Sequence, residues 1–288
     1  MMNNEELNKV AQEIREILVE RRKEFELTFL EEDHIYFMKD TDGKYRNNFP
    51  SVSKVLKHFY DEFPAEEIAL KKAGGNLKEQ QRLLEEWRAK GDASTNMGSR
   101  IHYFLEKQTL EMFGLDKEVR QPSFDCDLFQ LAKSESMIEG GKKYLDLCEQ
   151  RNLVLLDTEA VLGHPELGYT GQPDKVWLTT NAKGDEFGLL ITDWKSNQPK
   201  NFQVHNYTSS MKEPFDLYPN NALGHYFLQL PFYGKLLIKM LEGTKYENIK
   251  LYGCIIVLLT EDKDFVEYRV PKDVMSKILE MDMDFYIN

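Results

Sequence analysis

The sequence has few cysteines and no long hydrophobic run. Its three cysteines, Cys126, Cys148 and Cys254, lie far apart and form no Cys-x-x-Cys pair. This spacing argues against a disulfide framework and against a four-cysteine iron–sulfur or zinc site, so we expect three small buried hydrophobic side chains. No apolar run approaches the roughly 20 residues of a membrane span, and residues 1–24 lack a signal peptide's apolar centre. We therefore expect a cytoplasmic protein without a membrane partner.

Positive charge is also scarce. The 288 residues include 37 lysines and arginines against 49 aspartates and glutamates, which gives a formal net charge of −12. This balance argues against a protein that coats nucleic acid through bulk positive charge. It does not exclude an enzyme with a local basic groove, because carboxylates that bind a metal are included in the negative charge. No Gly-x-x-x-x-Gly-Lys-Ser/Thr motif occurs, so we expect no ATP site.

The pattern of apolar residues changes near residue 150. Residues 1–150 are mainly helical by their three-to-four-residue apolar spacing, with helices predicted over 5–24, 77–90, 97–112 and 126–150 and a polar break at 91–96. Residues 151–288 mix the two patterns, with strands predicted over 153–162, 169–179, 187–194, 251–259 and 265–270 and helices over 220–241 and 271–285. Short loops favour an antiparallel meander of the first three strands. We expect an α/β core with the helical part packed on it as one structural unit.

Acids and a lysine lie along these first three strands. Asp193-Trp194-Lys195 follows an apolar run, and eighteen residues separate Asp193 from Asp174, which follows a proline. Side chains two apart in a strand share a face, so Asp193 and Lys195 should point one way and Trp194 the other. In a meander, Glu159, Asp174 and Asp193 should converge at one edge.

Converging carboxylates raise one another's pKa unless a cation neutralises them. Mg²⁺ is the natural choice because it prefers oxygen ligands and keeps several waters, and Mn²⁺ is an expected substitute. Such a metal binds a phosphate oxygen and lowers the pKa of an attacking water. The Lys195 ammonium would position that water or stabilise charge building on the phosphorus. The pattern predicts phosphodiester hydrolysis, although each acid taken alone is more often a turn or surface residue.

Further motifs occur in a matching order. Over roughly residues 50–235 the chain resembles the PD-(D/E)xK nuclease superfamily, in particular its RecB-like and phage-type exonuclease branch. The motifs that carry this resemblance are Gly98-x-x-x-His102, Gly171-x-x-Asp174, Asp193-x-Lys195 and Tyr226-x-x-Gln229-x-x-x-Tyr233. The resemblance implies a restriction-endonuclease-like core, in which helices flank a central mixed sheet.

The resemblance also implies roles for the acids and the lysine. Asp174 and Asp193 would be metal ligands, with the backbone carbonyl of Trp194 as a candidate third ligand. Lys195 would be the catalytic lysine. Glu159 matches the upstream acid of the family, although strand glutamates often face solvent.

The helical motifs have alternative interpretations. His102 matches the family's metal-proximal histidine, but it also stands one turn before Glu106, as in a surface helix pair. Gln229 and Tyr233 would contact DNA or orient the lysine, or else simply pack on the sheet; Pro231 between them would shift one relative to the other. Candidate DNA contacts are the cations Lys71, Lys72, Arg88, Arg100, Lys107 and Lys200 and the base-stacking rings Tyr103, Tyr207 and Tyr226.

The resulting hypothesis is a metal-dependent DNA exonuclease that acts on single-stranded or end-containing DNA in recombination, repair or phage replication. Some relatives carry a four-cysteine iron–sulfur cluster, which these cysteines cannot supply. Because no ATP motor is expected, a helicase, polymerase or recombination partner would supply the DNA. The alternatives are an endonuclease with the same site and a nucleic-acid-binding module that does not cut.

Overall fold

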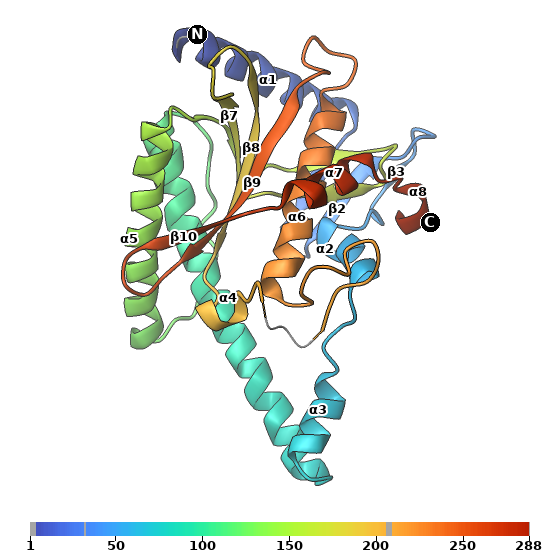
Figure 1. Ribbon diagram of the computed structural model, residues 1–288, viewed down its shortest axis with the longest axis vertical. Helices are drawn as coiled ribbons and strands as arrows, with labels where there is room; N and C mark the ends of the chain where they lie inside the picture. Colours follow the sequence, from blue (N-terminus) through green and yellow to red (C-terminus); the bar gives the residue numbers. More distant parts are fainter. Residues whose placement is uncertain (1–3, 32, 206–208, 288) are drawn as a thin grey trace.

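A mixed five-stranded sheet forms the centre of the computed structural model, which describes residues 4–31, 33–205 and 209–287 (Figure 1). The strand order is β10-β9-β8-β7-β4, with β4 at Val154–Thr158, β7 at Lys175–Thr180, β8 at Phe187–Lys195, β9 at Lys250–Leu259 and β10 at Phe265–Arg269. The pairs β4–β7, β7–β8 and β9–β10 are antiparallel, and β8–β9 is parallel. The predicted meander of β4, β7 and β8 is confirmed, and so is the α/β class.

Helices cover both faces of the sheet. On one face, α1 (Asn4–Glu24) and α6 (Ala222–Met240) share a core with alternate residues of the central strands, such as Val176 and Ile191. On the other face, α4 (Leu77–Phe113) and α5 (Leu128–Gln150) pack on the intervening residues, which include Trp177 and Trp194. Figure 1 shows α4 and α5 on one side of the strands and α6 on the other. Burial on both faces explains the nearly continuous apolar runs of these strands.

Helix α4 is a single 37-residue helix, so the predicted break at 91–96 is wrong. Gly91 is only a weak helix former. Ser94 and Thr95 satisfy their hydroxyls inside the helix by donating to the carbonyls of residues 90 and 91, at 2.9 and 3.1 Å. The first half of α4 and α3 (Ala65–Lys72) form an arm that projects from the body (Figure 1).

Two predicted strands are each divided. Residues 153–162 form β4 and the start of β5 (Leu162–His164), and residues 169–179 form β6 (Tyr169–Gly171) and β7; β5 and β6 pair as a separate small sheet. Pro173 lies at the division, where a residue without an N–H ends regular pairing. The remaining elements are β1 (Thr28–Leu30), β2 (Ile35–Lys39), β3 (Tyr45–Arg46), α2 (Val52–Val55), η1 (Leu56–Phe59), η2 (Pro199–Asn201), α7 (Lys272–Glu280) and α8 (Asp284–Ile287).

Two of the three cysteines, Cys148 and Cys254, are buried as expected, whereas Cys126 is only half-buried. Among the described residues, no helix combines the length and the apolar character needed to cross a membrane. Pro231 lies inside α6 without ending it.

Candidate functional site

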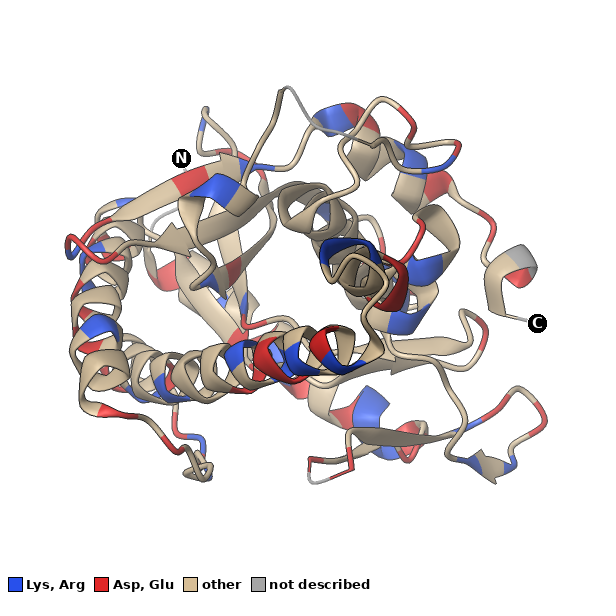
Figure 2. Cartoon of the chain, turned by 90° about the horizontal axis from the view of Figure 1, so that it is seen from below, with Lys and Arg blue, Asp and Glu red and all other residues tan. Residues whose placement is uncertain are grey.

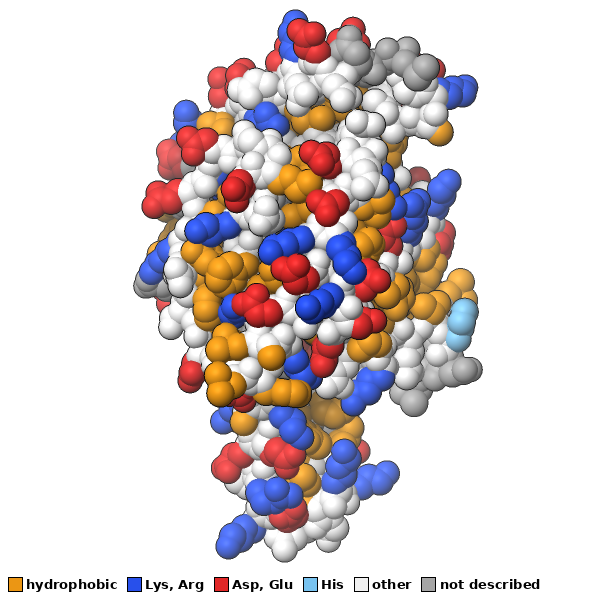
Figure 3. All heavy atoms as spheres, turned by 90° about the vertical axis from the view of Figure 1, so that its left-hand side faces the viewer, with side chains coloured by type: hydrophobic (Ala, Val, Ile, Leu, Met, Phe, Trp, Pro, Cys, Tyr) orange, Lys and Arg blue, Asp and Glu red, His pale blue; other side chains and the backbone are white. Residues whose placement is uncertain are grey.

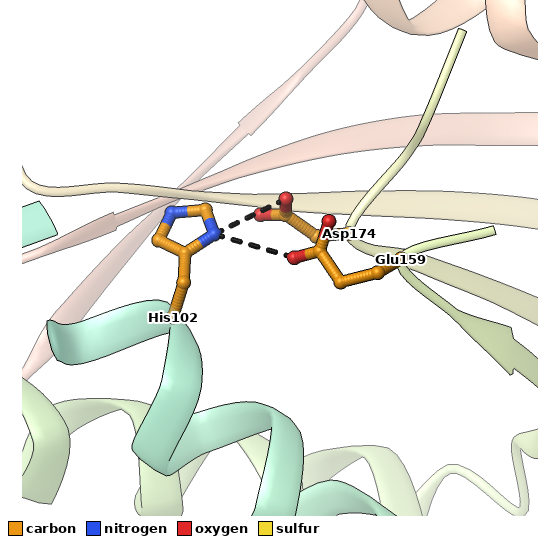
Figure 4. Close-up of side chains that lie close together, drawn as sticks. All are labelled: His102, Glu159 and Asp174. Atoms are coloured by element: carbon orange, nitrogen blue, oxygen red, sulfur yellow. Dashed lines mark ion pairs between the residues drawn. The ribbon is translucent and has the colours of Figure 1, made fainter. Parts of the chain in front are cut away.

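His102, Glu159 and Asp174 meet at one end of the sheet (Figure 4). Glu159 follows β4, Asp174 precedes β7, and His102 comes from α4. His102 Nδ1 lies 3.3 Å from Asp174 Oδ1 and 3.6 Å from Glu159 Oε1. One potential ligand atom from each residue lies within 4.8 Å of the others. The structure thus brings together three residues that are 15 to 72 positions apart in the chain.

The backbone holds Glu159 and Asp174 side by side. The N–H of Glu159 donates to the carbonyl of Asp174 at 2.9 Å, and the N–H of Ala160 donates to the carbonyl of Pro173 at 3.1 Å. Glu159 has a φ of 41°, which is unusual for a residue with a side chain and costs roughly 1 kcal/mol or more. Gln172 fixes this turn by donating to the Glu159 carbonyl at 3.3 Å.

Asp193 and Lys195 point to the same side of β8, as predicted. The Lys195 ammonium contacts Asp193 Oδ2 and lies 4.4 Å from the ring centroid of Tyr226 on α6. This contact pairs the buried Asp193 carboxylate with a single positive charge. The Tyr226 hydroxyl donates to Asn197 Oδ1 at 3.1 Å, which holds the ring beneath the ammonium.

Trp194 connects this strand to the acidic cluster. Its backbone N–H donates to Asp174 Oδ2 at 2.6 Å. Because the N–H and C=O of a strand residue point to the same edge, the Trp194 carbonyl also faces the Asp174 side. Its indole packs on the opposite face of the sheet, 5.3 Å from the ring of Tyr144 and 4.3 Å from the ammonium of buried Lys175.

Gln229 and Tyr233 stay in register on α6 despite Pro231. Gln229 Nε2 donates to the Tyr233 hydroxyl at 2.8 Å, so the proline does not separate the two side chains. Tyr233 is nearly buried and packs so tightly on Gly171 that an added Cβ there would lie 2.5 Å from Tyr233 Cε1. Close packing against Tyr233 therefore explains why the Gly-x-x-Asp174 pattern has a glycine at position 171.

Arg100, predicted as a DNA contact, does not join the site. Its guanidinium is buried, donates to Ser134 Oγ at 2.6 Å and forms an ion pair with Glu135 on α5. The charge also lies 4.8 Å over the ring of Phe104. Arg100 therefore ties α4 to α5, and the prediction that it faces DNA is corrected.

On the arm, which carries Lys71, Lys72 and Arg88, cations and acids are interspersed. Figure 2 shows lysines and arginines alternating with aspartates and glutamates along α4, and Arg82 pairs with Glu79 and Glu86. Lys72 lies over Trp87, at 5.1 Å from the ring centroid. Tyr207 lies outside the described residues.

The charges of the cluster shift one another's pKa values. Burial lowers the pKa of His102, but the charges of Asp174 and Glu159 outweigh it and raise that pKa to about 10. Burial and then the charge of Asp174 raise the pKa of Glu159 to about 7, although His102 opposes them. Burial and Asp174 likewise raise the pKa of Asp193 against the pull of Lys195. Two carboxylates are therefore short of positive charge.

Neighbouring opposite charges stabilise the charged forms of Asp174 and Lys195. Burial would raise the pKa of Asp174, yet the charges of His102 and Lys195 hold it well below its usual range. Burial would lower the pKa of Lys195, yet Asp193 and Asp174 hold it above its usual range. Asp174 therefore stays ionised and Lys195 stays protonated near neutral pH.

His102 lies between two pockets. The first, of about 670 Å³, is lined by Glu159 and Tyr233, and the second, of about 1080 Å³, is lined by Lys195 and Tyr226. His102 borders both pockets. His102 is thus accessible from both pockets and Glu159 from the first, and their side chains remain 31% and 28% exposed.

Sequence patterns did not identify two residues of the first pocket. Glu106 lines it beside Glu159 and accepts a hydrogen bond from Thr158 Oγ1 at 2.9 Å, so it does not pair with His102 as the alternative interpretation supposed. Tyr36, from β2, lines the same pocket. Its position in an alternating strand pattern gave no sign of a site, because its approach to Glu159 depends on tertiary folding.

Comparison with models of known protein families gives no match, and comparison with curated proteins gives none. The geometry of the site is therefore the basis for the function proposed below.

Proposed function

We propose that this chain is a metal-dependent deoxyribonuclease with a PD-(D/E)xK-type site on a restriction-endonuclease-like core, acting as an exonuclease on single-stranded or end-containing DNA. The observation that carries the proposal is the bond from the Trp194 N–H to Asp174 Oδ2. It joins the Asp193-x-Lys195 strand to the cluster of His102, Glu159 and Asp174. Residues of four separate segments thereby lie together in one candidate site.

The ligand atoms suit a hard divalent cation. Asp174 and Glu159 offer carboxylate oxygens beside His102. Asp193 and the Trp194 carbonyl would join them from β8, which the Trp194 N–H connects to Asp174. Burial and the charge of Asp174 raise the pKa values of Glu159 and Asp193, so added positive charge would stabilise this group. When bound, Mg²⁺ or Mn²⁺ would polarise a phosphate oxygen and acidify a water.

Lys195 is suited to act as a fixed positive charge. Because Asp193 and Asp174 keep it protonated, it would donate a hydrogen bond to a phosphate oxygen and stabilise negative charge on the phosphorus. It would not serve as a general base at neutral pH. Tyr226 holds the ammonium from below, and Gln229 and Tyr233 support the same side of the site.

The test is cutting of end-labelled linear DNA and of closed single-stranded circles, with Mg²⁺, Mn²⁺ or EDTA. Asp193→Ala and Lys195→Ala should each reduce metal-dependent cutting by about 100-fold or more. Lys250→Ala is the matched control, because Lys250 and Glu186 form an exposed lysine–acid pair at the other end of β8 and β9. It should cut like the wild type.

Each outcome separates the proposal from a rival. Cutting that survives both site substitutions would contradict the assignment of the site. Cutting of closed circles would identify an endonuclease with the same residues. A folded protein that binds DNA but cuts with neither metal would be a binding module.

A further inference from the structure

We propose that a single DNA strand reaches the site through the second pocket, where Phe129 stacks on a base and Lys133 contacts the backbone phosphates. This inference rests on the proposed function, because it supplies the path of the substrate to that site. The pocket lies between α4, the start of α5 and the segment after β8, and Lys195 and Tyr226 are among the residues that line it.

Phe129 is an exposed aromatic ring on a rigid support. It is 67% exposed in the first turn of α5, next to Leu128 at 86%. Asp127 and Gln130 form a reciprocal capping box that fixes this turn, and Gln130 also donates to the carbonyl of Ala93 on α4 at 3.3 Å. Figure 3 shows the side of the molecule that carries α5, with hydrophobic side chains gathered at the lower end of the body, directly above the arm.

Lys133 places a positive charge beside this ring. Its ammonium lies 4.6 Å from the ring centroid of Phe129 and 2.7 Å from Glu261 on the β9–β10 turn. Lys195 adds a second ammonium to the lining of the same pocket. A phosphate chain that runs from Phe129 to Lys195 would therefore contact two lysines.

The two pockets differ in the charged residues that line them. The second pocket is lined by three lysines and three acids, namely Lys90, Lys133, Lys195, Asp127, Glu261 and Asp262. The first pocket is lined by four glutamates, Glu31, Glu106, Glu118 and Glu159, against the cations Lys117 and Arg120. A polyanion is repelled more strongly by the first lining, so the second pocket is the better path.

The size and chemistry of the pocket favour an unpaired strand. A volume of about 1080 Å³ is near the upper size of a small-molecule site, which suits a few nucleotides and not a duplex. An exposed phenyl ring stacks only on bases whose faces are open, and this stacking tolerates any sequence. Phe129 would therefore select for single-stranded DNA without reading its bases.

The test measures binding without cutting. Fluorescence anisotropy follows a labelled oligothymidylate of about 15 nucleotides in EDTA, with a duplex and an oligouridylate of the same length alongside. Phe129→Ala should weaken binding of the single DNA strand about tenfold, and Phe129→Trp should preserve it. Phe63→Ala is the matched control, since Phe63 is 65% exposed but lies by the arm, 6.0 Å from Trp87. It should bind like the wild type.

Lys133→Gln should reduce the dependence of log affinity on log salt concentration by about 0.7 for one lost phosphate contact. Equal affinities of Phe129→Ala and Phe63→Ala, or a wild type that fails to bind the strand, would overturn the proposed path. Preference for the duplex or for oligouridylate would overturn the choice of single-stranded DNA. If binding depends on Phe129 but the protein does not cut DNA, the proposed nuclease activity is contradicted and the proposed strand path is supported. If cutting does not depend on Phe129, the strand path is contradicted and the nuclease activity is supported.

Discussion

The two motif glycines, Gly171 and Gly98, should respond in opposite ways to alanine. A Cβ on Gly171 would lie 2.5 and 2.7 Å from two ring carbons of Tyr233 and 3.0 Å from Val52 Cγ2. Tyr233 is nearly buried and bonded to Gln229, so its ring has little room to move. A Cβ on Gly98 would meet only a side-chain oxygen at 3.7 Å, which is an ordinary contact.

These contacts give the size of each effect. Overpacking of a tight core site costs about 1–3 kcal/mol, and roughly 3 °C of melting temperature accompanies each kcal/mol in a protein of this size. Gly171→Ala should therefore melt about 3 to 9 °C below the wild type and lose cutting activity as Tyr233 shifts. Gly98 lies inside α4, where alanine is favoured by up to about 1 kcal/mol, so Gly98→Ala should melt about 2 °C higher.

Thermal unfolding followed by circular dichroism measures both variants under identical conditions. The packing argument is refuted if Gly171→Ala melts with the wild type, or if Gly98→Ala is the less stable of the two. A stable Gly98→Ala protein that no longer cuts would show that substrate approaches the backbone of α4 at that residue.

Three more predictions concern stability. Arg100→Ala should lower the unfolding free energy by about 2 kcal/mol in a urea titration, because it removes the buried bond to Ser134, but it should not change DNA affinity. Burial lowers the pKa of His164 and of His225 to about 4, so the unfolded chain takes up protons first as the pH falls. The contribution of these two histidines should therefore be complete above about pH 6.5 and decline toward about pH 4; replacing both with glutamine should flatten a series of urea midpoints over this range. Mg²⁺ at 100 times its Kd should add about 2.7 kcal/mol to the wild type in thermal unfolding but little to Asp174→Asn, and an equal gain in the two would contradict the ligand assignment.

Local periodicity predicted the part of the site that lies within single strands. Alternation along β8 was enough to place Asp193 and Lys195 on one side and the Trp194 indole on the other, and the contacts agree. The expected pairing of neighbouring strands also placed Glu159 next to Asp174, although the β5–β6 hairpin lies between them. The inference along β8 needs only backbone geometry that holds within a few residues.

Features that depend on distant partners could not be predicted in this way. Arg100 looks like a surface cation until α5 brings Ser134 and Glu135 to it. The prediction of a break within α4 gave too much weight to weak local preferences. Glycine at position 91 costs a helix only about 1 kcal/mol, and helix propagation is cooperative. The positive φ of Glu159 likewise depends on bonds to Asp174 and Gln172, which no local pattern reveals.

The most direct test of the metal site is the rate of Mg²⁺-dependent DNA cutting by Asp174→Asn. Asparagine keeps the size of the side chain and an oxygen that can accept from the Trp194 N–H, but it removes the charge that faces His102. The site described above predicts a loss of about 100-fold or more in a variant that remains folded. A folded Asp174→Asn protein that cuts within a few-fold of the wild-type rate would contradict it.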